Sequence, residues 1–205
     1  MTTAVLIIDM QNAYFEDPVL QAQQDAVTAA CNGAIAAVQQ RDCPVLLVCT
    51  EHERDRSTWT LSMLDDDQGL IFRGSAQARV VPGLREQHLP RLVKTRDSAF
   101  FGTDLLLRLR NWSVDRVVLA GAATQNCIAQ TAADAFANNL RVVIARDAMA
   151  SDDADFASAM LDVLSEEYSQ PVLPQHQILK LLADDGNATD GRSSHRPADD
   201  DVGRG

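Results

Sequence analysis

The chain has 205 residues, 46 % of them hydrophobic, and a formal net charge of −11. That length suits one well-buried domain and is short for two. The negative charge argues against nucleic acid or an anionic membrane surface as a partner. No window approaches about 18 uncharged apolar residues, so we predict no membrane span.

Short, nearly continuous apolar runs alternate with helix-compatible segments along the chain. Runs of this kind are typical of strands that are buried on both faces. The predicted strands are residues 3–9, 43–50, 91–94, 115–121 and 141–147, with a weaker sixth near 170–173. The predicted helices are 21–40, 102–111, 127–138 and 154–167. This alternation predicts an α/β domain with a mainly parallel sheet and right-handed crossovers.

The segment from Glu51 to Leu89 interrupts the alternation. It is long and charged, and a loop of that length in a compact domain is usually a lid or a binding loop, although a plain surface insertion is the alternative. Ligands in such folds bind outside the carboxyl ends of the strands. Five residues are predicted to lie at that edge: Asp9, Thr50, Lys94, Gly121 and Asp147.

The last part of the chain has a different composition. From Ala183 to Gly205 there are six Asp and three Arg, with almost nothing apolar. We therefore predict a domain over residues 1–183 and an acidic, disordered tail over 184–205. The first residues do not have the pattern of a secretory signal, and no two cysteines form a CxxC pair, so we expect a cytoplasmic protein with reduced thiols.

Three polar residues stand where strands or loops end. Asp9 closes an apolar run, Lys94 closes another, and Cys127 opens an alanine-rich helix after "GAATQN". A helix N-terminus and a nearby cation lower the pKa of a cysteine, so we expect a nucleophilic thiolate at Cys127. A nucleophile, a carboxylate base and a lysine on one sheet edge are the groups that acyl transfer without histidine requires.

The motifs "LIIDMQNAYF", "LVKTRDSAFFGTDL" and "VVLAGAATQNCIAQTAADAFANNLRVVIARDAMAS" resemble those of the isochorismatase-like cysteine hydrolases, a family that includes nicotinamidase and N-carbamoylsarcosine amidohydrolase. The resemblance covers most of residues 3–182. It implies a three-layer α/β/α sandwich with a six-stranded, mainly parallel sheet, and a catalytic triad of Asp9, Lys94 and Cys127. It also implies a cis peptide at Ala122-Ala123 and an oxyanion hole formed by the backbone N–H groups of Ala123 and Cys127.

Two departures from family patterns narrow the expected chemistry. Nicotinamidases of the family carry an Asp-x-His pair at a metal site, but this chain has Glu51-His52-Glu53, so we expect no metal and no other cofactor. Relatives that hydrolyse the vinyl ether of isochorismate often have glycine at the position of Cys127. The cysteine therefore favours cleavage of a C–N bond in a small amide, carbamoyl or ureido substrate. Ether hydrolysis and a non-catalytic binding or assembly role are the alternatives.

Residues that contact the substrate are expected in the segments that border the site in relatives. The candidates are Gln11, Phe15, Trp59, Phe100 and Gln125, and for the aromatic residues core packing is an equal alternative. The family usually assembles, so a homodimer or homotetramer is expected.

Overall fold

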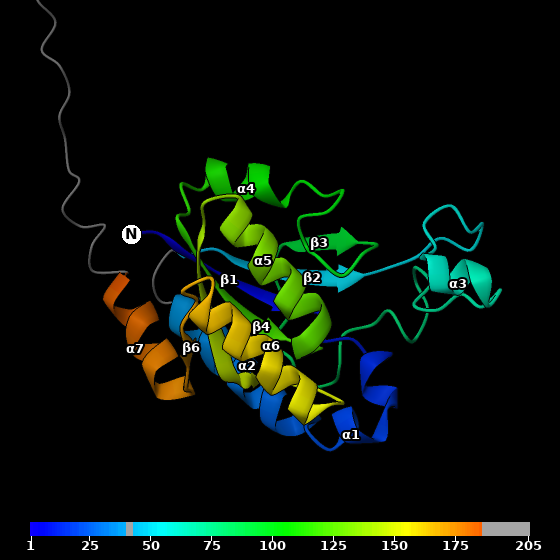
Figure 1. The fold of residues 1–205 in the computed structure, drawn as a ribbon, viewed down its shortest axis with the longest axis horizontal. Coiled ribbons are helices and arrows are strands. Elements are labelled where there is room, and N and C mark those ends of the chain that lie inside the picture. The colour runs from blue at the N-terminus through cyan, green and yellow to red at the C-terminus, as the bar shows by residue number, and fades with distance from the viewer. Residues whose placement is uncertain (40–42, 186–205) are drawn as a thin grey trace, which may run out of the picture.

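Six strands form one sheet through the middle of the molecule, in the order β3-β2-β1-β4-β5-β6 (Figure 1). The computed structural model describes residues 1–39 and 43–185. The strands are β1 (Thr3–Ile8), β2 (Val45–Thr50), β3 (Arg91–Lys94), β4 (Arg116–Gly121), β5 (Arg141–Met149) and β6 (Val172–Leu173). Every pairing between neighbours is parallel, which confirms the predicted α/β sheet and its short sixth strand.

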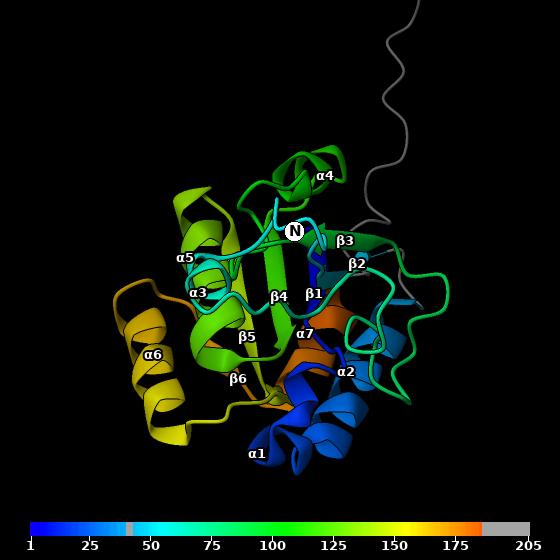
Figure 2. The ribbon, with the colours of Figure 1, turned by 90° about the vertical axis from the view of Figure 1, so that its right-hand side faces the viewer.

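Helices cover both faces of this sheet. They are α1 (Pro18–Gln21), α2 (Gln24–Gln39), α3 (Leu61–Asp65), α4 (Leu105–Asn111), α5 (Ala129–Ala137), α6 (Ala154–Glu166) and α7 (Gln175–Asp185). Figure 2 shows α5 and α6 on one side of the sheet and α2 on the other. The three-layer arrangement expected from the resemblance is therefore confirmed.

The side chains of β1 show why its sequence is apolar throughout. Val5 and Ile7 belong to the apolar cluster that includes side chains of α2 and α7. Leu6 and Ile8 point the other way, into a cluster with side chains of α4 and α5. Because successive side chains enter opposite covered faces, a central strand of this sheet has no polar face.

Helix α7 was not predicted, and it changes the boundary of the domain. The helix extends to Asp185, whose carboxylate pairs with Arg116 and accepts a hydrogen bond from Thr3. Asp184 and Asp185 therefore belong to the folded domain and not to the tail. The remainder of the predicted tail, residues 186–205, lies outside the described residues.

The position of Asp147 also differs from the prediction. Strand β5 continues past this residue to Met149, and the Asp147 carboxylate accepts a hydrogen bond of 2.7 Å from the backbone N–H of Gln175, at the start of α7. Asp147 therefore stabilises the beginning of that helix and is not among the residues at the sheet edge described below.

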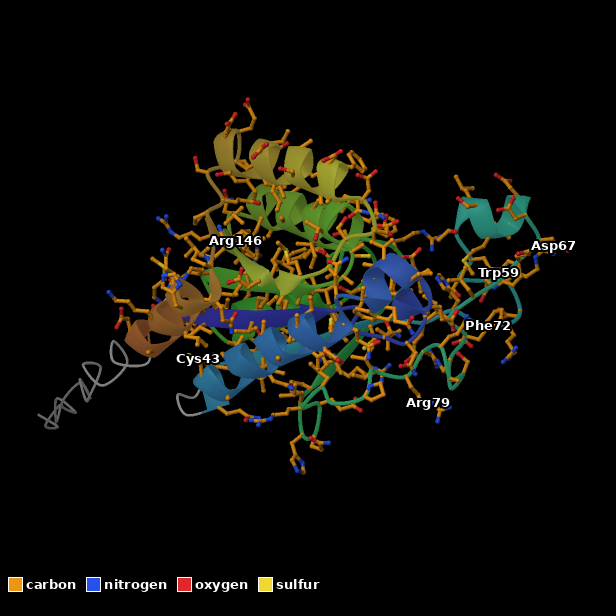
Figure 3. The ribbon with its side chains drawn as sticks, turned by 90° about the horizontal axis from the view of Figure 1, so that it is seen from below. Cys43, Trp59, Asp67, Phe72, Arg79 and Arg146 are labelled. Atoms are coloured by element: carbon orange, nitrogen blue, oxygen red, sulfur yellow. The ribbon has the colours of Figure 1, made fainter. Side chains whose placement is uncertain are left out.

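The segment from Glu51 to Leu89 leaves the sheet after β2 and carries α3 outward (Figure 1). Trp59 and Phe72 lie together in it, with ring centroids 6.1 Å apart (Figure 3). The guanidinium of Arg54 lies 4.6 Å from the Phe72 ring centroid, and that of Arg56 lies 5.1 Å from the Trp59 ring centroid. The segment thus has packing of its own.

No helix among residues 1–39 and 43–185 is both long enough and apolar enough to cross a membrane.

Candidate active site

Three neighbouring strands end at one place and bring the first polar residues together. Asp9 follows the last residue of β1, Thr50 ends β2, and Lys94 ends β3 directly beside Thr50. Asp9 has a backbone φ of 51°, in the left-handed region that Asp tolerates better than most residues. Its N–H still bonds to the Val48 carbonyl at 2.9 Å. The backbone therefore turns at Asp9 and holds its carboxylate over the end of the sheet.

Asp9 and Lys94 form a buried ion pair. The Lys94 Nζ lies 2.7 Å from Asp9 Oδ2, and the two side chains are 1 % and 0 % exposed. Both groups also contact the Thr50 hydroxyl, which donates to Asp9 Oδ1 at 2.9 Å and accepts from Lys94 Nζ at 2.8 Å. Thr50 thus fixes the carboxylate and the ammonium relative to each other.

Cys127 completes the cluster from the other half of the sheet. It lies in a π-helical turn, Thr124–Ile128, between β4 and α5, and its side chain is 2 % exposed. Lys94 Nζ donates to Cys127 Sγ at 3.4 Å, and the thiol donates to Asp97 Oδ1 at 3.8 Å. The structure therefore brings the three residues of the predicted triad together.

The backbone before Cys127 has an unusual course. The Ala122-Ala123 peptide is cis, as the resemblance implied. Gly121 precedes it with a φ of 126°, and a Cβ at this glycine would lie 1.8 Å from the Ile8 carbonyl oxygen. Only glycine fits there. Within the described residues, the Ala123 N–H has no hydrogen-bond acceptor, which leaves a backbone donor next to the thiol-bearing turn.

The electrostatics at Cys127 differ from the expectation of a resting thiolate. Burial raises the pKa of the Cys127 thiol well above its usual value, the Asp9 charge raises it further, and the opposing effect of Lys94 is smaller. Burial alone lowers the pKa of Lys94, but the charges of Asp9 and Cys127 outweigh it, and the net direction is upward. The stable resting state is therefore an Asp9–Lys94 ion pair beside a neutral thiol.

This charge state makes a prediction about alkylation. The rate at which iodoacetamide modifies Cys127 should rise about tenfold per pH unit from pH 7 to 9, because the thiolate fraction grows until the raised pKa is passed. Mass spectrometry of the peptide that contains Cys127 measures this rate. A rate that is already constant below pH 8 would show a preformed thiolate and contradict the assignment.

Two of the predicted substrate contacts have other partners. The Gln11 amide donates to the carbonyls of Thr50 and Ala78 at 2.8 and 3.0 Å, and its oxygen accepts from the Thr50 N–H at 2.7 Å. The Gln125 amide donates to Asp152 and accepts from the Ser151 hydroxyl. Both side chains hold neighbouring loops in place in this structure.

The aromatic candidates are divided between core and surface. Phe15 is 3 % exposed and belongs to the apolar cluster that includes side chains of α2 and α7. Trp59 is 8 % exposed, and its Nε1 donates to the Glu53 carbonyl. Phe100 is half-buried and packs against the apolar cluster that includes side chains of α4 and α5. His52 is buried, with Nδ1 2.8 Å from the Thr58 carbonyl, and burial lowers its pKa. The ring is therefore neutral, with its proton on Nδ1.

Tyr14 and Asp97 belong to this cluster, although neither was a candidate site residue in the sequence analysis. The Tyr14 hydroxyl donates to Thr50 Oγ1 at 3.1 Å, and burial, followed by the charges of Asp9 and Cys127, raises its pKa. The only available signals were their positions, Tyr14 five residues after Asp9 and Asp97 three residues after Lys94.

A cavity of about 590 Å³ lies at the other end of the sheet, where β4 and β5 begin. Its lining includes Arg116, Tyr168 and Gln170. It contains none of the triad residues, so the geometry of the cluster, rather than the size of a cavity, identifies the candidate site.

Comparison with known proteins identifies the family of this chain. A model of the isochorismatase domain matches residues 3–173. A probable inactive nicotinamidase from Arabidopsis thaliana is 32 % identical over 181 residues, which cover 83 % of this chain and 92 % of the relative. The maleamate amidohydrolase of Pseudomonas putida is 31 % identical over 166 residues, 73 % of this chain and 76 % of the relative.

A solved structure supports the same assignment. An isochorismatase family protein from Desulfovibrio vulgaris superimposes with a TM-score of 0.78 at 31 % identity, covering 89 % of this chain and 98 % of that protein. The sheet order, the matched domain and these relatives lead to one conclusion: the chain belongs to the isochorismatase-like hydrolase family.

Proposed function

We propose that this protein is a cysteine hydrolase that cleaves the C–N bond of a small amide, carbamoyl or ureido substrate through a thioester on Cys127. The observation that carries the proposal is the buried contact chain from Asp9 to Lys94 to Cys127, with distances of 2.7 and 3.4 Å. A buried ion pair costs desolvation energy and is weak evidence for stability alone. Because this ion pair contacts the Cys127 thiol, it can take part in proton transfer from the sulfur.

In the first step, Asp9 accepts the thiol proton as Cys127 attacks the carbonyl carbon. Asp9 Oδ2 is buried, with the Lys94 ammonium as its close partner and no well-angled hydrogen bond from any described residue. That oxygen therefore has a lone pair for the proton. The transfer replaces an Asp9–Lys94 pair by a Lys94–Cys127 pair, so the net charge of the buried cluster does not change.

The second step collapses the tetrahedral intermediate. Its oxyanion is stabilised by the N–H groups of Ala123 and Cys127, and the free Ala123 donor supports this role. The proton on Asp9 goes to the leaving nitrogen, which departs as ammonia or an amine. Water, deprotonated by Asp9, then hydrolyses the thioester and restores the thiol.

The name of one relative supports C–N cleavage, whereas the name of another supports a non-catalytic role. One relative is a maleamate amidohydrolase, which acts on an amide. Another carries the name of a probable inactive nicotinamidase, so a non-catalytic role has to be tested directly. Hydrolysis of a vinyl ether is the other alternative, and it predicts activity that does not need the thiol.

Ammonia release from a panel of amides and ureides tests the proposal. We expect wild-type protein to release ammonia from at least one compound among nicotinamide, N-carbamoyl amino acids, ureidoacrylate, biuret and aliphatic amides. Cys127→Ala should lose at least about a thousandfold in rate, since it removes the nucleophile. Cys43→Ala, at a half-buried cysteine outside the cluster, is the matched control and should retain the wild-type rate.

Three results would count against the proposal. Turnover that persists in Cys127→Ala would exclude a thioester on this residue. Cleavage of an ether substrate with no amide turnover would favour isochorismatase-type chemistry. The absence of turnover with both the amide panel and the ether substrates would favour the non-catalytic role.

We also propose that the protein acts in the cytoplasm as a homodimer or homotetramer. Exposed apolar side chains support self-association, among them Leu61 at 79 % and Phe101 at 65 % exposure. Sedimentation velocity measures the assembly directly.

A further inference from the structure

A second carboxylate lies beside the candidate nucleophile, on the outer side of the cluster. Asp97 Oδ1 is 3.8 Å from Cys127 Sγ, and the Asp97 side chain is exposed, whereas Asp9 is fully buried. The Gln130 amide, one turn along from Cys127, donates to Asp97 Oδ2 at 2.7 Å. This contact holds the carboxylate on the solvent side of the thiol.

The charge of Asp97 is not neutralised by a basic side chain. No Lys, Arg or His nitrogen in the described part of the chain lies within 4.0 Å of its carboxylate. The adjacent Arg96 donates instead to the carbonyls of Thr58, Thr95 and Trp59, at 3.0, 2.6 and 3.2 Å. Its guanidinium therefore fastens the 51–89 segment to β3.

Asp97 therefore places an unpaired negative charge beside the thiol. The buried trio of Asp9, Lys94 and Cys127 is neutral as a whole in its resting state. Asp97 adds one negative charge within contact distance of the sulfur. A substrate that brings a carboxylate close to its reacting carbonyl would meet repulsion there, whereas an N–H group would meet a hydrogen-bond acceptor.

We propose that Asp97 determines substrate specificity, by accepting N–H groups of neutral or cationic amides and ureides and by disfavouring substrates with a carboxylate near the scissile bond. This inference rests on the proposed function and narrows it to a substrate charge class. It disfavours isochorismate, which is a dicarboxylate, and it equally disfavours the carboxylate-bearing amides and ureides of the panel, such as N-carbamoyl amino acids and ureidoacrylate.

Asp97 is a weaker candidate for the general base than Asp9. The hydrogen bond that it accepts from the thiol is long, at 3.8 Å, and water competes for its exposed oxygens. Asp9 is shielded from water and shares Lys94 with the thiol. The two roles make different predictions for a neutral reagent, and the experiment below separates them.

Alkylation of Cys127 by a neutral and an anionic reagent tests the proposal without a known substrate. The full-length wild-type protein and Asp97→Asn are treated with iodoacetamide or iodoacetate at pH 9, and modification of the Cys127 peptide is followed by mass spectrometry. The iodoacetate-to-iodoacetamide rate ratio should rise about two- to fivefold in Asp97→Asn, the factor that corresponds to an exposed unit charge at this range. Asp162→Asn makes the same charge change on the exposed face of α6 and should leave the ratio at its wild-type value.

The outcomes of the alkylation experiment distinguish a failure of the Asp97 proposal from a failure of the proposed function. An unchanged ratio in Asp97→Asn, or an equal rise in Asp162→Asn, overturns the specificity role. A fall of tenfold or more in the iodoacetamide rate identifies Asp97 as a base and also overturns it. A Cys127 that neither reagent modifies in wild type overturns both this inference and the proposed function. A shifted ratio in a protein that turns over no amide overturns the proposed function, and with it the amide specificity, and leaves only the charge effect of Asp97 on the thiol.

Turnover provides the corresponding test once an amide substrate is found. Propionamide and succinamate differ by a carboxylate, and their kcat/KM ratio should shift toward succinamate by a similar factor in Asp97→Asn. A ratio that stays at the wild-type value contradicts the role of Asp97.

Discussion

Replacing Lys94 with Met is expected to lower the free energy of unfolding by about 3–5 kcal/mol. The substitution preserves most of the volume of the side chain but leaves the Asp9 carboxylate, which is 0 % exposed, without its counter-ion. Thr50 would still donate to Asp9 Oδ1, so one of the two oxygens would keep its partners. Urea unfolding followed by circular dichroism measures the change.

The double variant Asp9→Asn with Lys94→Met provides the control. With both charges removed, no unpaired ion remains, so the double variant should lose less stability than the sum of the two single variants, by about 2 kcal/mol or more. Strict additivity, or a cost below about 1 kcal/mol for Lys94→Met, would show that the pair is not buried as described.

Gly121→Ala should be at least as damaging, for a steric reason. The new methyl would lie 1.8 Å from the Ile8 carbonyl oxygen and 2.7 Å from the Ile8 carbonyl carbon, and both are backbone atoms of a central strand. Since neither can move without disturbing the β1–β4 pairing, we expect a loss of more than about 3 kcal/mol. The shift would also reach Asp9 and Ala122, which adjoin the two strand ends, so activity per folded molecule should fall as well.

Gly102→Ala separates steric contact from backbone conformation. Gly102 also has a positive φ, 67°, but a Cβ there would have nothing within 4 Å. Its substitution should cost only about 1 kcal/mol, the usual penalty for a side chain in this backbone region. Equal costs for the two variants in urea unfolding would contradict the steric explanation of Gly121.

The sheet and the triad could be predicted because their signals are local. The apolar run of Thr3–Ile8 is nearly continuous because both faces of β1 are covered, and the polar residue that follows it must lie at the sheet edge. The same argument places Lys94 at the end of β3. The alternation of strands and helices then brings Cys127 to the same edge.

The features that were missed depend on contacts between distant segments. Thr50 was correctly predicted at the sheet edge, but its hydrogen bonds with Asp9, Lys94 and Tyr14 were not predicted. The protonation state of Cys127 was predicted in the wrong direction. The helix start and the lysine favour a thiolate, but burial and Asp9 outweigh them, and the degree of burial is set by the assembled fold.

Helix α7 was missed for a similar reason, and the hydrogen-bond partners of the two candidate glutamines also depend on the assembled fold. Ile178 and Leu182 are the ends of the short apolar run ILKLL, and they face the core because α2 and β5 provide a surface for them. Gln11 and Gln125 have donors and acceptors suited to a substrate, but their hydrogen bonds in the fold go to nearby protein groups. The sequence alone does not distinguish a glutamine that binds substrate from one that bonds to neighbouring protein groups.

Rapid acid quenching during turnover is the most direct test of the thioester on Cys127. The amide that releases ammonia fastest is mixed with wild-type protein, the reaction is quenched within a few turnovers, and the Cys127 peptide is weighed by mass spectrometry. We predict that this peptide carries the mass of the acyl group and that Cys127→Ala forms neither adduct nor product. An unmodified peptide in wild type, together with continued turnover by Cys127→Ala, would contradict the mechanism.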